Sequence, residues 1–159
     1  DICDQDNLVD FAELLLRSYE LLYQNPDLLN LYRNKFKNIL VDEFQDTNVI
    51  QYAFLRLLIG KDNLPFVVGD DDQSIYRWRG AKMEHIAQYQ KDYPETEVVT
   101  LEQNYRSSAN ILKAANSVIN NNEIRMPKEL WTNGDSGDLI RVFAAFNERE
   151  EASFITGII

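Results

Sequence analysis

Two adjacent carboxylates follow a short apolar run, and they are the first residues of the sequence that can do chemistry. Residues 39–41 (Ile-Leu-Val) lead directly into Asp42 and Glu43. Such a run predicts a strand buried on both faces of a parallel sheet. Acids at its carboxyl end lie at the edge where open α/β sheets bind ligands. The alternative reading is that these two acids simply end a strand at the surface.

In a nucleoside triphosphatase, this pairing is the Walker B arrangement. The first acid, Asp42, would lie near a phosphate-bound Mg²⁺ ion, and Glu43 would orient the attacking water. We therefore take Asp42 as a candidate metal ligand and Glu43 as a candidate catalytic residue.

A second group of functional residues lies in residues 67–81, VVGDDDQSIYRWRGA. The amide of Gln73 can donate to a phosphate oxygen and accept from water, so it can report whether a γ-phosphate is present. Tyr76 and Trp78 offer flat faces for stacking on bases, and Arg79 offers a guanidinium group beside them. The alternative makes the two aromatics core residues and the three Asp residues a turn.

The third group is residues 101–107, LEQNYRS. An Arg placed between a strand and a capped helix can act as an arginine finger on a transferring phosphate, and Arg106 has this position. The ring of Tyr105 can stack on a purine. The alternative is an ordinary surface ion pair between Arg106 and Glu102.

Strands that alternate with helices must position these groups, and they indicate a three-layer α/β sheet. We expect strands at 39–41, 66–68, 97–101 and 139–143. Helices are expected at 8–22, 27–36, 49–59, 83–92, 109–120 and from 148 onward, with Asp27, one of residues 46–48, and Ser107 or Ser108 as N-caps. A lobe boundary is expected near residues 101–104.

Composition limits the function classes. The 159 residues are 45% hydrophobic and 11% aromatic, which argues against disorder. No apolar run approaches the roughly 20 residues of a membrane helix, so we expect no membrane partner. The only cysteine, Cys3, predicts a reducing compartment, the cytoplasm, and together with the only histidine, His85, it makes a zinc site improbable.

The net charge of −10 argues against a generic electrostatic binder of nucleic acid, which would be basic. Any nucleic-acid contact must therefore be local, and residues 76–82 are the candidate because they combine aromatic and cationic side chains.

Taken in order and at these gaps, VDEFQDTN, VVGDDDQSIYRWRGA and LEQNYRSS closely resemble motifs II, III and IV of the UvrD/Rep/PcrA group of superfamily 1 DNA helicases. The resemblance covers nearly the whole chain. It implies a partial P-loop NTPase (RecA-like) motor domain of three αβα layers and the start of a second motor domain. Residues 1–36 would end an accessory subdomain, 37–101 would form the later half of the first motor domain, and 102–159 would begin the second.

The resemblance also implies roles in nucleotide chemistry. Asp42 would hold Mg²⁺, Glu43 would be the general base for water, and Gln73 would sense the γ-phosphate and couple it to DNA. Tyr105 would pack on adenine, and Arg106 would be the finger contributed by the second motor domain.

On the DNA side, Tyr76 and Trp78 would stack on single-strand bases, with Arg79 supporting that site. Members of this group are 3′→5′ translocases that open duplex DNA with ATP in repair or replication, and repair proteins are possible partners.

One family motif is missing from the sequence, because no G-x-x-x-x-G-K-[ST] occurs anywhere. The only Gly-Lys pair, Gly60-Lys61, is followed by Asp62. We therefore expect an internal fragment that is inactive alone. The alternatives are the helicase subunit of a recombinational-repair helicase–nuclease and a non-catalytic binding module on the same fold. The presence of Glu43, Gln73 and Arg106 argues against the last of these.

Overall fold

The computed structural model describes residues 8–123 and 125–159, and the chain divides into two compact units between Val98 and Val99. Cys3 and the first residues assigned to the accessory subdomain lie outside the described residues. Each unit is described by itself.

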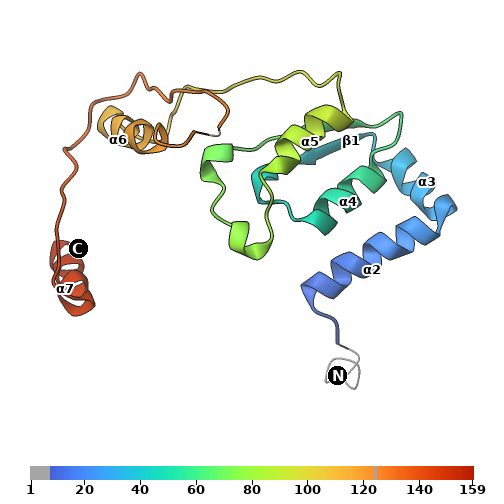
Figure 1. The fold of residues 1–159 in the computed structure, drawn as a ribbon, viewed down its shortest axis with the longest axis horizontal. Helices are drawn as coiled ribbons and strands as arrows, with labels where there is room; N and C mark the ends of the chain where they lie inside the picture. Colours follow the sequence, from blue (N-terminus) through green and yellow to red (C-terminus); the bar gives the residue numbers. More distant parts are fainter. Residues whose placement is uncertain (1–7, 124) are drawn as a thin grey trace. The chain divides into compact units, whose positions relative to one another are not determined.

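In the part of the first unit that the structure describes, four helices combine with two short strands (Figure 1). The helices are α2 (Phe11–Gln24), α3 (Pro26–Lys35), α4 (Val49–Leu58) and α5 (Glu84–Asp92). The strands are β1 (Asn38–Val41) and β2 (Leu64–Val67), and three single turns of 3₁₀ helix complete the unit: η1 (Phe44–Asp46), η2 (Asp71–Gln73) and η3 (Arg77–Arg79).

Side-chain caps fix where the helices begin. The carboxylate of Asp10 accepts from the backbone N–H of Glu13 at 2.7 Å and starts α2. Asn48, one of the three residues expected to cap α4, forms a reciprocal capping box with Gln51 at the start of that helix. The expected Asp27 cap is wrong, because Pro26 already occupies the first turn of α3. Proline is well suited there, since the first-turn N–H it lacks has no partner within a helix.

The sheet is parallel and two-stranded, and Leu40 pairs with Phe66 while Val41 pairs with Val67. One of its faces is covered by α4 and α5, which lie beside β1 in Figure 1. The core between them contains buried Phe44, Tyr52, Leu55, Ile59 and Tyr89, packed against Ile39, Val41 and Val67 of the sheet. The α/β prediction is therefore confirmed.

The other face of this sheet is open to solvent in the described residues. Leu40, Leu64 and Phe66 are 75%, 70% and 62% exposed. The expectation that the strand at 39–41 is buried on both faces is therefore wrong. The described helices supply cover on one side only, so the third layer of the expected αβα sandwich is not formed.

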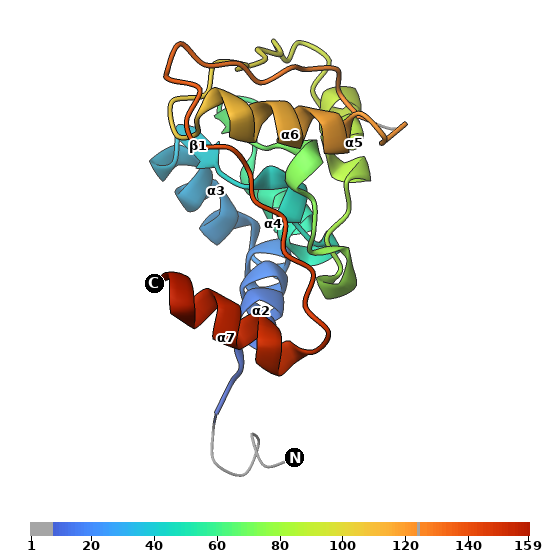
Figure 2. The same cartoon turned by 90° about the vertical axis from the view of Figure 1, so that its left-hand side faces the viewer.

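The helices α2, α3 and α4 pack against one another, and Figure 2 shows α2 running close to α4 from a second direction. The side chain of Asn63 joins the ends of α3 and α4. It accepts from Gly60 N–H at 2.8 Å and donates to the carbonyls of Arg33 and Phe36. This buried amide holds the start of β2 against the ends of α3 and α4.

The second unit contains α6 (Ala109–Ile119) and α7 (Glu148–Ile158). A parallel β-bridge joins Gln103 to Trp131, and the Asn116 amide exchanges two hydrogen bonds with the backbone of Leu130. Asn147 caps α7 by accepting from Glu150 N–H at 3.0 Å. Ser108 is the N-cap residue of α6, one of the two expected positions, but its side chain makes no capping hydrogen bond.

Two expected strands, at 97–101 and 139–143, are wrong. Neither segment forms a ladder in the described part of the chain, and Leu101 and Val142 are 79% and 92% exposed. Strand propensity reports how well a side chain fits a pleated, half-buried surface. These segments have no neighbouring strand among the described residues, so the apolar pattern is not realised as a sheet.

Among the described residues, no helix is long and apolar enough to cross a membrane.

Candidate functional site

The parallel pairing of β1 and β2 brings the two acidic segments to one edge of the sheet. The pairing continues past the strands, because Val68 N–H donates to Val41 O at 2.8 Å and Phe44 N–H donates to Val68 O at 3.0 Å. Asp42 and Glu43 therefore leave the sheet beside the turn that carries Gln73. We call this region, residues 42–45 and 69–73, the acidic edge.

Glu43 has the only left-handed non-glycine backbone among the described residues, with φ of 51°. The Glu43 backbone N–H donates to Oδ1 of the preceding residue, Asp42, at 2.9 Å. A non-glycine residue in this conformation costs roughly 1 kcal/mol or more and is enriched at functional sites. Both carboxylates are exposed, so they are open to a ligand.

Gln45 lies beneath Glu43 and was not singled out from the sequence. Its side chain is 1% exposed, donates through Nε2 to Glu43 Oε2 at 2.7 Å, and accepts through Oε1 from Asp70 N–H at 3.0 Å. A buried amide bonded on both sides is held rigidly. The sequence signal was weak: a polar residue inside the run DEFQD.

Gln73 lies on η2 at the same edge, with an exposed side chain. Its Nε2 donates to Asp70 Oδ2 at 2.6 Å, and Asp70 Oδ1 accepts from Asp72 N–H at 3.1 Å. Asp70 therefore organises the turn that presents the predicted sensor.

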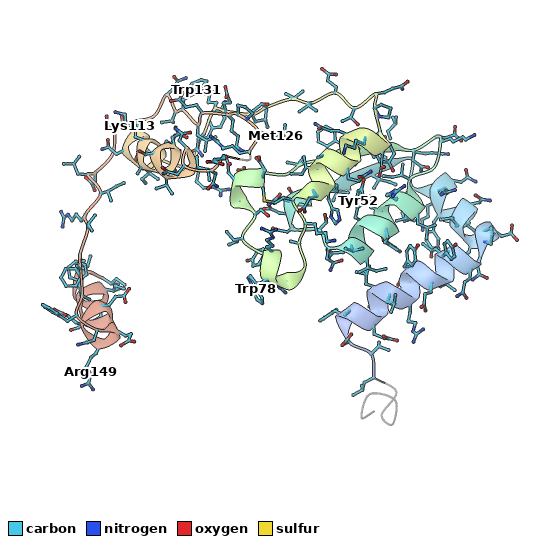
Figure 3. The ribbon with its side chains drawn as sticks, in the orientation of Figure 1. Tyr52, Trp78, Lys113, Met126, Trp131 and Arg149 are labelled. Atoms are coloured by element: carbon cyan, nitrogen blue, oxygen red, sulfur yellow. The ribbon has the colours of Figure 1, made fainter. Side chains whose placement is uncertain are left out.

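The residues predicted to bind DNA form one exposed cluster on η3 and the residue before it, which we call the aromatic platform: Tyr76, Trp78 and Arg79. The two ring centres are 6.5 Å apart, and the Arg79 guanidinium carbon lies 5.4 Å from the first and 5.6 Å from the second. Trp78 is 80% exposed and points away from the ribbon in Figure 3. The alternative that Trp78 is a core residue is therefore wrong.

A second set of contacts links the segment after Glu43 to the segment after the platform. Lys82 N–H donates to Thr47 O at 3.2 Å, and His85 Nδ1 lies 3.1 Å from both Thr47 oxygens. The His85 ring stacks on Tyr52 with 4.7 Å between ring centres. Burial lowers the pKa of His85, opposed by its hydrogen bond to the Thr47 backbone.

Tyr52 continues these contacts into α5. Its hydroxyl donates to Asp92 Oδ2 at 2.7 Å, and burial followed by this bond raises the pKa of Tyr52. Arg56 pairs with the same carboxylate at 3.2 Å. The helices under the acidic edge are thus joined by polar as well as apolar contacts.

In the second unit, Tyr105 and Arg106 are both exposed on the turn that precedes α6. The Asn104 side chain accepts from the N–H groups of Arg106 and Ser107 at 2.9 and 2.7 Å, which fixes that turn. The alternative partner, Glu102, instead accepts from Glu129 N–H at 3.1 Å. Tyr105 borders an open pocket of about 380 Å³ lined by Thr100, Leu101, Glu102, Gln103, Tyr105 and Trp131.

The sequence was also compared with known proteins. Residues 1–94 match the UvrD/REP helicase N-terminal domain, and residues 99–159 match the UvrD-like helicase C-terminal domain. The chain belongs to the UvrD-like DNA helicase family.

Individual relatives are similar over all or nearly all of the chain. DNA helicase II of Escherichia coli (strain K12) is 55% identical over 159 residues, which are 100% of this chain and 22% of that protein. DNA helicase II of Haemophilus influenzae is 54% identical over the same shares of each chain. The ATP-dependent DNA helicase PcrA of Staphylococcus aureus (strain Mu50) is 48% identical over 151 residues, covering 95% of this chain and 21% of the relative. The chain thus spans about a fifth of the length of these relatives.

Proposed function

We propose that the protein carrying this chain is an ATP-dependent DNA helicase that moves 3′→5′ along single-stranded DNA and separates duplexes in repair or replication. The observation that carries this proposal is the acidic edge. There, Glu43 follows the end of β1, Gln73 lies on η2 after the neighbouring parallel strand β2, and the aromatic platform begins three residues after Gln73. The proposed γ-phosphate sensor and the proposed DNA contact then lie on one short segment of the chain.

The acidic edge fits a magnesium–ATP complex. An exposed carboxylate is the hard oxygen ligand that Mg²⁺ takes in phosphate sites, and Asp42 offers one. Bound Mg²⁺ would neutralise charge on the phosphates. Glu43 has an exposed carboxylate on a constrained backbone, so it is proposed as the base that orients and deprotonates water. Gln73 is proposed as the γ-phosphate sensor, since its amide can both donate and accept.

The aromatic platform suits single-stranded DNA despite the acidic chain. Base–aromatic stacking needs an exposed ring and tolerates any sequence, and Trp78 offers such a ring. The adjacent Arg79 supplies positive charge at this site, although the net charge of the chain is −10.

The second unit is proposed to contribute the remaining nucleotide contacts. Arg106 is the proposed arginine finger and Tyr105 the proposed adenine contact, both held on the turn that Asn104 organises. We assign residues 37–101 to the first RecA-like motor domain and residues 102–159 to the second as part of the same proposal.

Strand displacement on tailed duplexes tests the proposed function. The full-length protein should separate a duplex carrying a 3′ single-stranded tail when ATP and Mg²⁺ are present. A matched duplex with a 5′ tail should remain paired, and ADP should not replace ATP. Equal separation of both substrates, or separation without ATP, would contradict the proposal.

A further inference from the structure

We infer that Gln45 is a positioning residue for Glu43: its buried amide holds the Glu43 carboxylate and ties it to the turn that presents Gln73. The inference rests on the proposed function, because it takes Glu43 as the base of that reaction. It assigns a role to a residue that was not singled out from the sequence.

The orientation of the Gln45 amide is fixed by its partners. A backbone N–H can only donate, so the atom that receives Asp70 N–H at 3.0 Å must be the amide oxygen. The amide nitrogen then faces Glu43 Oε2 at 2.7 Å. A flipped amide would place two donors face to face at Asp70 and two acceptors face to face at Glu43. Both hydrogen bonds therefore specify one arrangement.

Burial makes this arrangement rigid. Gln45 is 1% exposed, so water cannot replace either bond without opening the site. The backbone of Gly69 passes close to the amide, and a Cβ placed there would lie 3.0 Å from Gln45 Oε1 and 3.3 Å from Phe44 Cβ. The absence of a side chain at Gly69 lets the two segments approach this closely.

The contacts continue from the base to the sensor. Gln45 bonds the backbone of Asp70, and Asp70 Oδ2 accepts from Gln73 Nε2 at 2.6 Å. A continuous chain therefore runs from Glu43 through Gln45 and Asp70 to Gln73. A movement of the Gln73 turn would be transmitted to the Glu43 carboxylate through one buried amide.

An exposed Glu carboxylate has several rotamers, and only some would place it against an attacking water. The bond from Gln45 selects among them, and small displacements of a catalytic group can cost roughly 10²-fold in rate. Gln45 therefore acts on the chemical step through the position of Glu43, without touching the substrate itself.

The test compares Gln45→Glu with a matched buried amide in the full-length protein. Gln45→Glu keeps the acceptor for Asp70 N–H and replaces the donor to Glu43 with a carboxylate oxygen. Asn63→Asp makes the same exchange at a buried amide that joins α3, α4 and β2 away from the site. Turnover of ATP with single-stranded DNA, nucleotide affinity by titration with a fluorescent ATP analogue, and thermal unfolding are measured for both.

We expect Gln45→Glu to lower kcat on the order of 10–10²-fold, with nucleotide affinity near that of the unsubstituted protein. Asn63→Asp should lower the unfolding temperature but leave kcat nearly unchanged at a temperature where it is folded. In a Glu43→Gln background, Gln45→Glu should cause no further loss, because its effect passes through the Glu43 carboxylate.

An unchanged kcat for Gln45→Glu, or an equal loss with and without Glu43→Gln, would overturn the inference while leaving the proposed function intact. Absence of DNA-stimulated turnover in the unsubstituted protein would overturn the proposed function and this inference with it. If Gln45→Glu does not fold, Gly69→Ala supplies the same comparison, since it presses on Gln45 Oε1 while keeping the amide.

Discussion

The guanidinium carbon of Arg79 lies 5.6 Å from the ring centre of Trp78, on an exposed turn that begins a few residues after Gln73. A cation at this distance from an indole is attracted to the ring face and limits how the ring can move. Arg79 therefore holds a stacking surface in place and adds positive charge beside it, which is what a single-strand contact on an acidic protein requires.

Removal of that ring should weaken DNA binding without unfolding the protein. Trp78→Ala in the full-length protein should cost roughly 1–3 kcal/mol of single-strand binding, the range for a lost base–aromatic stack. Stimulation of ATP turnover by DNA should fall, while turnover without DNA should be spared. Fluorescence anisotropy with a labelled single-stranded oligonucleotide measures the change in binding free energy.

Tyr23→Ala is the matched control, because Tyr23 is also an exposed aromatic, at 66%, and lies on α2. It should bind DNA like the unsubstituted protein. Equal losses in the two variants would mean that Trp78 contributes no specific stack.

Arg106 should matter for the rate more than for nucleotide binding. Arg106→Ala should reduce ATP turnover by about 10³–10⁵, as for other arginine fingers. Arg106→Lys should restore little, because Lys lacks the planar fork of donors. Arg141→Ala, another exposed Arg of the second unit, should be near normal in steady-state turnover. Full activity of Arg106→Lys would show that charge alone suffices and would remove the finger role.

Local stability around His85 should depend on pH. Burial lowers the pKa of this imidazole in the folded protein, so the folded state binds its proton less readily than the unfolded state. The contribution of the buried neutral ring to the free energy of unfolding is therefore fully present above the unfolded pKa of about 6.5. It is lost as the pH falls toward the lower pKa of the folded state. Neighbouring Lys82 favours the neutral ring, whereas Glu84 favours the charged one.

Hydrogen exchange of the amides in α4 and α5 measures this effect. Protection should fall as the pH is lowered below about 6.5, after correction for intrinsic exchange. The fall should be smaller in His85→Gln, which cannot titrate there. An identical fall in both proteins would show that other groups set the pH dependence.

The parts of the fold that could be predicted are those coded by nearby residues. The helix at 49–59 was predicted with its cap among residues 46–48, because Asn48 and Gln51 lie within one turn of each other. The strands at 97–101 and 139–143 failed for the opposite reason. A strand depends on a neighbour elsewhere in the chain, and the described residues provide none for either segment.

The same distinction holds for the site. Asp42, Glu43 and Gln73 could be selected because each follows a strand-like run, and the structure places them at one sheet edge. Gln45 could not be selected, since its role comes from the Asp70 N–H 25 residues away. The residue types of the aromatic platform were evident, but only the structure shows that Trp78 is exposed rather than buried.

Residues 1–159 alone should not hydrolyse ATP. The sequence contains no glycine-rich loop with its Lys, and that loop supplies most of the phosphate contacts in this kind of site. Metal binding should also be weak, because Mg²⁺ relies on the phosphates as ligands. A purified sample of these residues, assayed with excess single-stranded DNA, should match a Glu43→Gln sample. DNA-stimulated turnover that the substitution removes would reveal a phosphate site in this chain.

The most direct test of the account is ATP turnover by the full-length protein and its Glu43→Gln variant, with saturating single-stranded DNA. Exchange of the carboxylate for an amide keeps the size of the side chain and removes its ability to accept a proton. The account predicts nearly unchanged ATP binding and turnover lower by on the order of 10²–10⁴, the range for loss of a general base. Near-normal turnover in the Glu43→Gln variant would contradict it.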